Sequence, residues 1–141
     1  MILPDVNVLI YAVWPDSVDH RAYRDWLERV VGADEAYAMS PQVLSSVTRI
    51  LTNRKAFPGP YTVDKVLGYA NTLLSRPQCQ IVQPGPRHWR IFCDLCRRAN
   101  ATGNLVQDAW FAALAIEWGC EWITTDRDYA RFPGLRWRTP F

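Results

Sequence analysis

Apolar residues recur at the spacing of an α-helix in six stretches of the chain, and polar or turn-forming residues stand at the ends of these stretches. Ser40 and Thr62 are suited to cap the helices that follow them. Asn104 is predicted to cap the last long helix, and Gly119 is predicted to end it. Helices are therefore predicted over residues 6–13, 20–32, 41–53, 63–74, 87–100 and 105–118.

Short apolar stretches between these helices predict strands over residues 1–5, 36–40, 80–82, 120–125 and 135–138, and residues 54–60 predict a loop. Strands that alternate with helices form a parallel sheet with helices on both faces. A chain of 141 residues can bury one core and is too short for two ordinary domains. We therefore expect a single three-layer α/β domain over residues 1–141, with a parallel sheet of four or five strands.

Three aspartates stand where such a fold brings distant parts of the chain together. Asp5 and Asp126 each follow a predicted strand, and the carboxyl ends of parallel strands meet at one edge of the sheet. Asp108 is predicted in the first turn of the last long helix, and it faces the same crevice only if that helix starts over this edge. Mg²⁺ prefers such oxygen ligands. Asp128 is a fourth candidate, in a sequence that also fits a solvated turn.

The composition adds a weak indication of the partner. The net charge is +2, and fourteen of the sixteen basic residues are arginine, whose planar side chain suits phosphate. No stretch is apolar for long enough to cross a bilayer, and no leader sequence is recognised, so we expect a cytoplasmic protein. Cys93 and Cys96 are interpreted as reduced, mostly buried thiols inside a helix, and we expect no catalytic role for His20 or His88.

Four motifs, in order along nearly the whole chain, resemble those of PIN-domain proteins, and more narrowly those of the VapC toxins of type II toxin–antitoxin pairs. They are LPDVNVL at 3–9, RILTN at 49–53, GNLVQDA at 103–109 and TTDRDY at 124–129. The resemblance implies an endoribonuclease that depends on Mg²⁺ or Mn²⁺ and cleaves RNA of the tRNA or rRNA class. It also implies a small VapB-type antitoxin as a partner, and a homodimer.

The same resemblance assigns roles to the aspartates. Asp5 and Asp108 match the principal metal-binding acids of the family, and Asp126 matches the acid after the fourth strand, so all three are candidate catalytic and metal-binding residues. Asp128 is a further candidate metal ligand. The chain departs from the family at Ser46, because a glutamate commonly stands three residues before the arginine that matches Arg49.

Two other functions remain open at this point. A phosphatase with an aspartyl nucleophile also begins with a strand that ends in aspartate, but it has a second acid two residues later, where this chain has Asn7. A PIN module with weakened catalysis, acting by binding RNA or an antitoxin, is favoured by Ser46, since a hydroxyl supplies no negative charge to a metal site.

Six of the seven tryptophans fall into two groups. Those that fit core positions are Trp26, Trp110, Trp118 and Trp122. Trp14 and Trp137 fit exposed positions, where an aromatic ring is available for base stacking or for contact between two copies of the chain.

Overall fold

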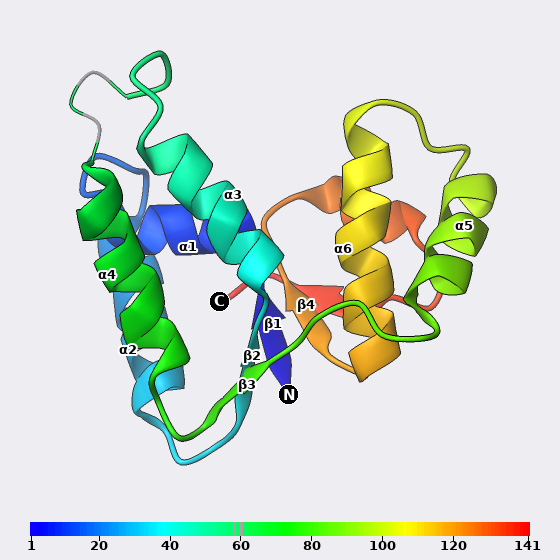
Figure 1. The fold of residues 1–141 in the computed structure, drawn as a ribbon, viewed down its shortest axis with the longest axis horizontal. Coiled ribbons are helices and arrows are strands. Elements are labelled where there is room, and N and C mark those ends of the chain that lie inside the picture. Colours follow the sequence, from blue (N-terminus) through cyan, green and yellow to red (C-terminus); the bar gives the residue numbers. More distant parts are fainter. Residues whose placement is uncertain (58, 60) are drawn as a thin grey trace.

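The computed structural model describes residues 1–57, 59 and 61–141 (Figure 1). Helices and strands alternate along this part of the chain, as predicted, and a 3-10 helix, η1, precedes the last strand. In chain order the elements are β1 (Ile2–Pro4), α1 (Val6–Val13), α2 (His20–Gly32), β2 (Tyr37–Met39), α3 (Pro41–Leu51), α4 (Val63–Leu74), β3 (Cys79–Ile81), α5 (His88–Arg98), α6 (Asn104–Trp118), β4 (Glu121–Ile123), η1 (Arg127–Arg131) and β5 (Trp137–Arg138).

The strands are all parallel, and their order places the two ends that carry acids beside each other. β4 lies between β1 and β5, and Pro4 pairs with Ile123 in the register of β1 and β4. β2 pairs with β3, and β2 also lies next to β1. The predicted parallel sheet is thus confirmed, although its hydrogen-bonded ladder is divided into a three-stranded and a two-stranded part in the described residues.

The helices cover the strands from two sides. In Figure 1, α1, α2, α3 and α4 gather on one side of the strands, and α5 and α6 pack together on the other. Consecutive right-handed crossovers produce such an arrangement when strands and helices alternate. This three-layer architecture confirms the fold class that the sequence predicts.

Small side chains let α6 pack closely against β4. Ala109, Ala112 and Ala113 are fully buried on this helix, and the ring of Phe111 stacks on Trp122 of β4 with ring centroids 5.6 Å apart. Close packing of this kind leaves little freedom for movement between the two elements. The position of Asp108, one residue before Ala109, is therefore fixed relative to the end of β4.

The caps explain where most helices begin and end. Ser40 Oγ accepts hydrogen bonds from Gln42 N and Val43 N, Thr62 Oγ1 accepts one from Lys65 N, and Gly119 ends α6 in the left-handed conformation at φ 66°, all as predicted. The start of α6 was predicted wrongly. Its N-cap is Gly103, at φ 58°, and no side chain caps the helix. Asp108 consequently lies beyond the first turn, because Asn104 is already helical.

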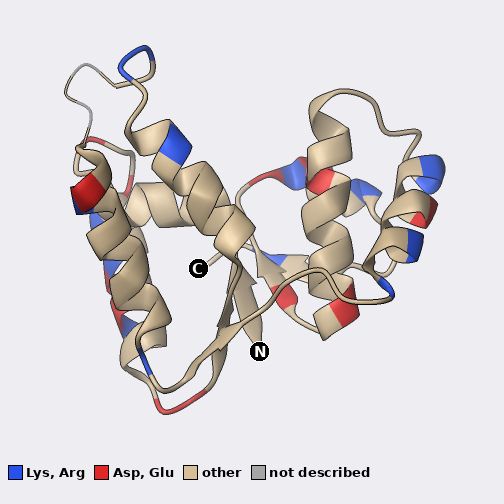
Figure 2. Cartoon of the chain, in the orientation of Figure 1, with Lys and Arg blue, Asp and Glu red and all other residues tan. Residues whose placement is uncertain are grey.

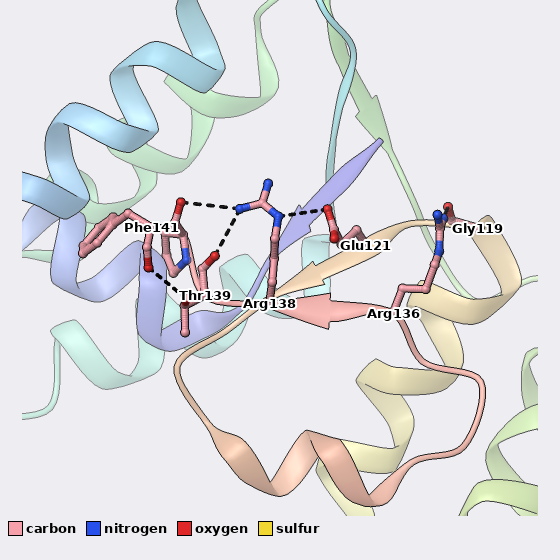
Figure 3. A network of polar contacts seen from close by, with 7 residues as sticks. Gly119, Glu121, Arg136, Arg138, Thr139 and Phe141 are labelled. Carbon is pink, nitrogen blue, oxygen red and sulfur yellow. Dashed lines mark hydrogen bonds and ion pairs between the residues drawn. The ribbon is translucent and has the colours of Figure 1, made fainter.

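Two arginines, Arg138 of β5 and Arg136 just before it, bind residues at or before the start of β4 (Figure 3). Arg138 Nε lies 3.1 Å from Glu121 Oε2, and the guanidinium of Arg136 donates to the carbonyl oxygen of Gly119 at 2.8 Å. The backbone N–H of Thr124 also donates to the carbonyl oxygen of Arg138 at 3.0 Å. The arginine contacts fix the beginning of β4, and the Thr124 contact holds its carboxyl end, on the side away from β1.

The cysteines, the apolarity of the helices and the predicted loop were further subjects of prediction. Cys93 and Cys96 are free thiols inside α5 but are half-buried, so the expectation of mostly buried thiols was wrong for them. No helix of the described residues is long and apolar enough to span a membrane. The predicted loop over residues 54–60 includes Pro58 and Pro60, which lie outside the described residues.

Candidate active site

Asp5 is held by three hydrogen bonds at the junction of β1 and α1. Its backbone N–H continues the ladder by donating to the carbonyl oxygen of Ile123 at 2.8 Å. Its Oδ1 caps α1 by accepting from Val6 N at 2.6 Å, and its Oδ2 accepts from Thr124 Oγ1 at 2.6 Å. The side chain is 5% exposed. The carboxylate is therefore both buried and fixed in orientation.

Thr124 joins the elements that surround Asp5. Its fully buried hydroxyl donates to Asp5 and accepts from Asp126 N at 3.0 Å and from Asn7 Nδ2 at 3.3 Å. One hydroxyl thereby connects the end of β1, the first turn of α1 and the turn after β4. This role of Thr124 was not predicted, although a hydroxyl residue between a buried strand and an acid was a usable signal.

Asp108 of α6 meets a buried tyrosine. The hydroxyl of Tyr129 donates to Asp108 Oδ1 at 3.5 Å, and the Tyr129 ring packs on Trp122 and Phe132 with centroids 5.4 and 5.9 Å away. Burial, followed by the charges of Asp5, Asp108 and Asp126, raises the pKa of Tyr129. The hydroxyl thus remains protonated and faces the acids. Sequence analysis did not identify Tyr129, which reads as an ordinary core aromatic.

Asp126 and Asp128 belong to the turn that follows β4. Asp126 caps η1, and its Oδ1 accepts from Asp128 N at 2.8 Å. Asp126 is half-buried, whereas Asp128 is exposed. Asp126 is therefore the less exposed of the two, and its charge acts on both Asp5 and Asp108, whereas the charge of Asp128 acts on Asp108 alone.

Electrostatic repulsion shows that the acids share one environment. The pKa of Asp5 is raised from 3.8 to about 6, mainly by burial and further by the charges of Asp108 and Asp126. The pKa of Asp108 is raised to about 6 as well, by burial and then by Asp126, with a smaller effect of Asp128. Like charges this close disfavour ionisation, and a bound cation would relieve the repulsion.

The donor set suits a hard cation with few protein ligands. Within the described residues, no three His, Cys, Asp or Glu side chains are grouped so as to hold one ion together. Mg²⁺ commonly takes only one or two carboxylates and completes its shell with water and phosphate oxygens. One further oxygen is at hand, because the buried Oδ1 of Asn7 has no hydrogen-bond partner in the described part of the chain.

Ser46 lies on the face of α3 that turns toward α6. Gln42, one helical turn earlier, accepts a hydrogen bond at its Oε1 from Trp110 Nε1 of α6. Residues four apart share a face of a helix, so Ser46 faces the same side, and it is half-buried. Ser45 instead lines a groove between α3 and α4.

Both histidines are bound to backbone carbonyl oxygens. His88 is buried, and its Nε2 donates to the carbonyl oxygen of Trp110 at 2.9 Å, while His20 Nδ1 lies 2.8 Å from the carbonyl oxygen of Tyr11.

Core positions are confirmed for Trp26 and Trp122 but not for Trp118, which is 40% exposed, and Trp110 is half-buried. Trp14 and Trp137 are half-buried rather than exposed.

Fold and site together define a three-layer α/β protein with interacting acids at the carboxyl edge of its parallel sheet. The PIN domain matches residues 2–135, and the chain belongs to this family. Ribonuclease VapC43 of Mycobacterium tuberculosis is 39% identical over 140 residues, which cover 99% of this chain and 95% of that protein. Ribonuclease VapC25 of the same organism is 36% identical over 136 residues, or 96% of each chain.

Solved structures agree on the fold. VapBC2 from Rickettsia felis, bound to a DNA fragment from the promoter, matches with a TM-score of 0.71 and 19% identity over 99% of this chain and 98% of that one. VapC20 of Mycobacterium tuberculosis, described as a toxin that cleaves the sarcin–ricin loop, matches with a TM-score of 0.64 and 15% identity over 96% and 99% of the two chains.

Proposed function

We propose that this protein is a metal-dependent endoribonuclease that acts as the toxin of a toxin–antitoxin pair. The observation that carries the proposal is the pair of repelling carboxylates, Asp5 and Asp108, which come from distant parts of the chain and whose pKa values are both raised to about 6. Relatives named VapC ribonucleases, matched over nearly their full length, support the substrate class. Structural neighbours solved as VapBC complexes support an antitoxin of the VapB type as partner.

The metal is proposed to be Mg²⁺, with Mn²⁺ as a substitute. Asp5 and Asp108 would hold it, with Asp126 contributing through a bound water and Asn7 Oδ1 as a further oxygen. The chemistry supplied at this site by a divalent ion would be polarisation of the scissile phosphodiester and activation of water for in-line attack. Asp128, which is exposed, would add negative charge that attracts the ion.

The chain's own residues orient the site. Thr124 fixes one oxygen of Asp5 and also holds the turn that carries Asp126. Tyr129 donates to Asp108 and keeps its carboxylate from turning away from the crevice. At pH 7.5 both carboxylates lie above their pKa values of about 6 and are mostly ionised, so they can act as ligands. Such preorganisation removes the need for side-chain rearrangement when the ion and the RNA bind.

The proposed function also implies an RNA substrate, an antitoxin and a second copy of the chain as partners. RNA of the tRNA or rRNA class would be guided by exposed arginines through sequence-independent contacts with its phosphates. The antitoxin would cover the acidic crevice, and two copies of the chain would form a homodimer.

Cleavage assays on two kinds of substrate test this function. We expect the purified protein to cleave RNA internally with Mg²⁺ or Mn²⁺ present, to stop when EDTA is added, and to leave p-nitrophenyl phosphate intact. An aspartyl-nucleophile phosphatase would hydrolyse the phosphomonoester. A protein that binds RNA and cleaves neither substrate at any metal concentration would instead support the catalytically weakened module.

Ser46→Glu is expected to lower the Mg²⁺ concentration needed for half-maximal RNA cleavage by roughly tenfold or more. The added carboxylate would face the crevice, and at an effective dielectric of about 20 its attraction for an ion in contact amounts to several kcal/mol before desolvation and repulsion are subtracted. Ser46→Ala should change little.

Ser45→Glu is the matched control, because it adds the same charge to the same helix but in the groove beside α4. Titration of the cleavage rate with Mg²⁺ compares the four proteins. Equal midpoints for wild type and Ser46→Glu would mean that residue 46 does not face the metal.

A further inference from the structure

An aromatic ledge, formed by Trp89 and Phe92 of α5 and Trp110 of α6, lies on the surface of the α5–α6 layer. Trp89 is 65% exposed, the largest exposed fraction of any aromatic side chain in the described residues. Its ring nevertheless contacts its neighbours, with centroid distances of 5.4 Å to Phe92 and 6.5 Å to Trp110. Phe92 and Trp110 lie 5.1 Å apart in an edge-to-face arrangement. Trp89 therefore extends a cluster of contacting aromatic rings to the surface.

The base of the ledge is rigid. Trp110 donates a hydrogen bond from Nε1 to Gln42 Oε1 of α3. The ring of His88 packs edge-on against Trp110 at 4.2 Å, and its Nε2 bonds to the carbonyl oxygen of the same residue. His88 is 1% exposed and its role is thus to support Trp110. A platform held from three elements can bind a flat ligand without first becoming ordered.

The ledge belongs to the same elements as Asp108 and Ser46, through α6 and through a hydrogen bond to α3. Trp110 follows Asp108 by two residues on α6. Gln42, which binds Trp110, precedes Ser46 by one turn on α3. A molecule that rested on the ledge would therefore lie at a fixed position relative to the acids.

Basic residues lie at several positions along α5 (Figure 2), and the arginines among them are exposed. Arg90 and Arg97 are seven residues apart, or two helical turns, and so share one face of this helix. Within the described residues neither has a carboxylate within 4 Å, whereas Arg98 pairs with Asp94 at 3.4 Å and Arg87 donates to the carbonyl oxygen of Glu117. Two guanidinium groups are thus available to an anion.

We propose that the ledge is a binding subsite for an unpaired base of the RNA substrate, which stacks on Trp89 while Arg90 and Arg97 contact the adjoining phosphates. This inference rests on the proposed function, since it takes RNA as the substrate. Bases stack on exposed aromatic rings whatever their identity, and arginines add a backbone contribution. In the described part of the ledge only the Trp89 ring is strongly exposed, and the exposed residues beside it, Arg87 and Arg90, are charged. Such a surface suits a base and its phosphates better than a protein partner.

Binding of a short, fluorescein-labelled single-stranded RNA in EDTA tests the subsite without cleavage. We expect Trp89→Ala to weaken binding about five- to hundredfold, the range for loss of one stacked base, and Trp89→Tyr to retain most of the affinity. The matched control is Trp118→Phe, which removes another exposed tryptophan far along α6 and should leave binding unchanged. An oligonucleotide of the same length with abasic sites should bind wild type and Trp89→Ala equally.

The contribution of Arg90 and Arg97 can be measured separately, through the salt dependence of RNA binding. Replacing Arg90 and Arg97 together by glutamine should reduce the slope of log affinity against log salt by about 0.7 per lost phosphate contact, whereas Trp89→Ala should leave this slope unchanged.

Three results would overturn the subsite: equal RNA affinity of wild type and Trp89→Ala, equal losses on the base-containing and abasic strands, or a change in oligomeric mass of Trp89→Ala that accounts for its weaker binding. Failure of the proposed function looks different. If wild type binds RNA through Trp89 but cleaves none, the nuclease proposal fails and the subsite stands. If the protein cleaves RNA and its binding does not depend on Trp89, the nuclease proposal stands and the subsite fails.

Discussion

Replacing Asp5 or Asp108 by asparagine is expected to reduce the rate of RNA cleavage roughly a thousandfold or more while the fold stays intact. Each change keeps the size of the side chain but removes one of the two buried or half-buried charges proposed to hold the metal. A metal ion contributes several kcal/mol to stabilising the charge of the transition state, and each tenfold in rate corresponds to about 1.4 kcal/mol. Single-turnover cleavage of RNA at saturating Mg²⁺ measures the loss.

The matched control for both variants is Asp34→Asn, at an exposed aspartate outside the crevice. It should cleave at the wild-type rate. Circular dichroism must show the same helix content for all four proteins. Wild-type cleavage by Asp5→Asn and by Asp108→Asn would mean that the acidic crevice is not the active site.

Without a divalent ion, the stability of the protein is expected to fall as pH rises from about 4 to about 7. The pKa of Asp5 is about 6 in the folded state and near 3.8 when unfolded, so in this window the folded state binds more protons than the unfolded state. The free energy of unfolding then decreases with rising pH. For Asp5 the difference corresponds to at most about 3 kcal/mol, and Asp108 contributes in the same direction but less, because it is partly solvated.

Asp5→Asn should remove most of this dependence. In EDTA at pH 7.5 we expect the variant to be about 1 to 3 kcal/mol more stable than wild type, and at pH 4 to be about equally stable. Urea denaturation at the two pH values measures the difference, with Asp34→Asn as the control. Saturating Mg²⁺ should stabilise wild type more than the variant, because ligand binding favours the folded state. A wild-type stability that rises between pH 4 and 7 in EDTA, unchanged by Asp5→Asn, would contradict the raised pKa.

Local signals predicted most of the framework. Ser40 and Thr62 cap helices, and Gly119 ends one, because these residues satisfy backbone groups within a few positions of their own. The start of α6 was mispredicted because Asn104 fits a cap by residue type, whereas the positive φ of Gly103 lets the glycine begin the helix. The choice between two adjacent capping residues depends on the path of the preceding loop, which local sequence does not specify.

The acids of the site were predicted more completely than the residues that hold them. Asp5 and Asp126 could be placed together because both follow strands, and their strands are indeed neighbours. Thr124 and Tyr129 could not be placed, because their roles arise from contacts across 119 residues, to Asp5, and across 21 residues, to Asp108. Trp89 was missed for a related reason: its exposure depends on how α5 packs on α6, and helical spacing alone does not set that packing.

Direct measurement of metal binding tests the central claim, that Asp5 and Asp108 jointly hold a divalent ion. Isothermal titration of the purified protein with Mn²⁺ at pH 7.5, in the absence of RNA, requires no assumption about the substrate. We expect wild type and Asp34→Asn to bind with the same affinity, and Asp5→Asn and Asp108→Asn each to bind at least about tenfold more weakly, the effect of about 1.4 kcal/mol. Lowering the pH of the wild-type titration to 5 should weaken binding as well, because protons then compete for both carboxylates. Unchanged Mn²⁺ affinity in both variants would contradict the account.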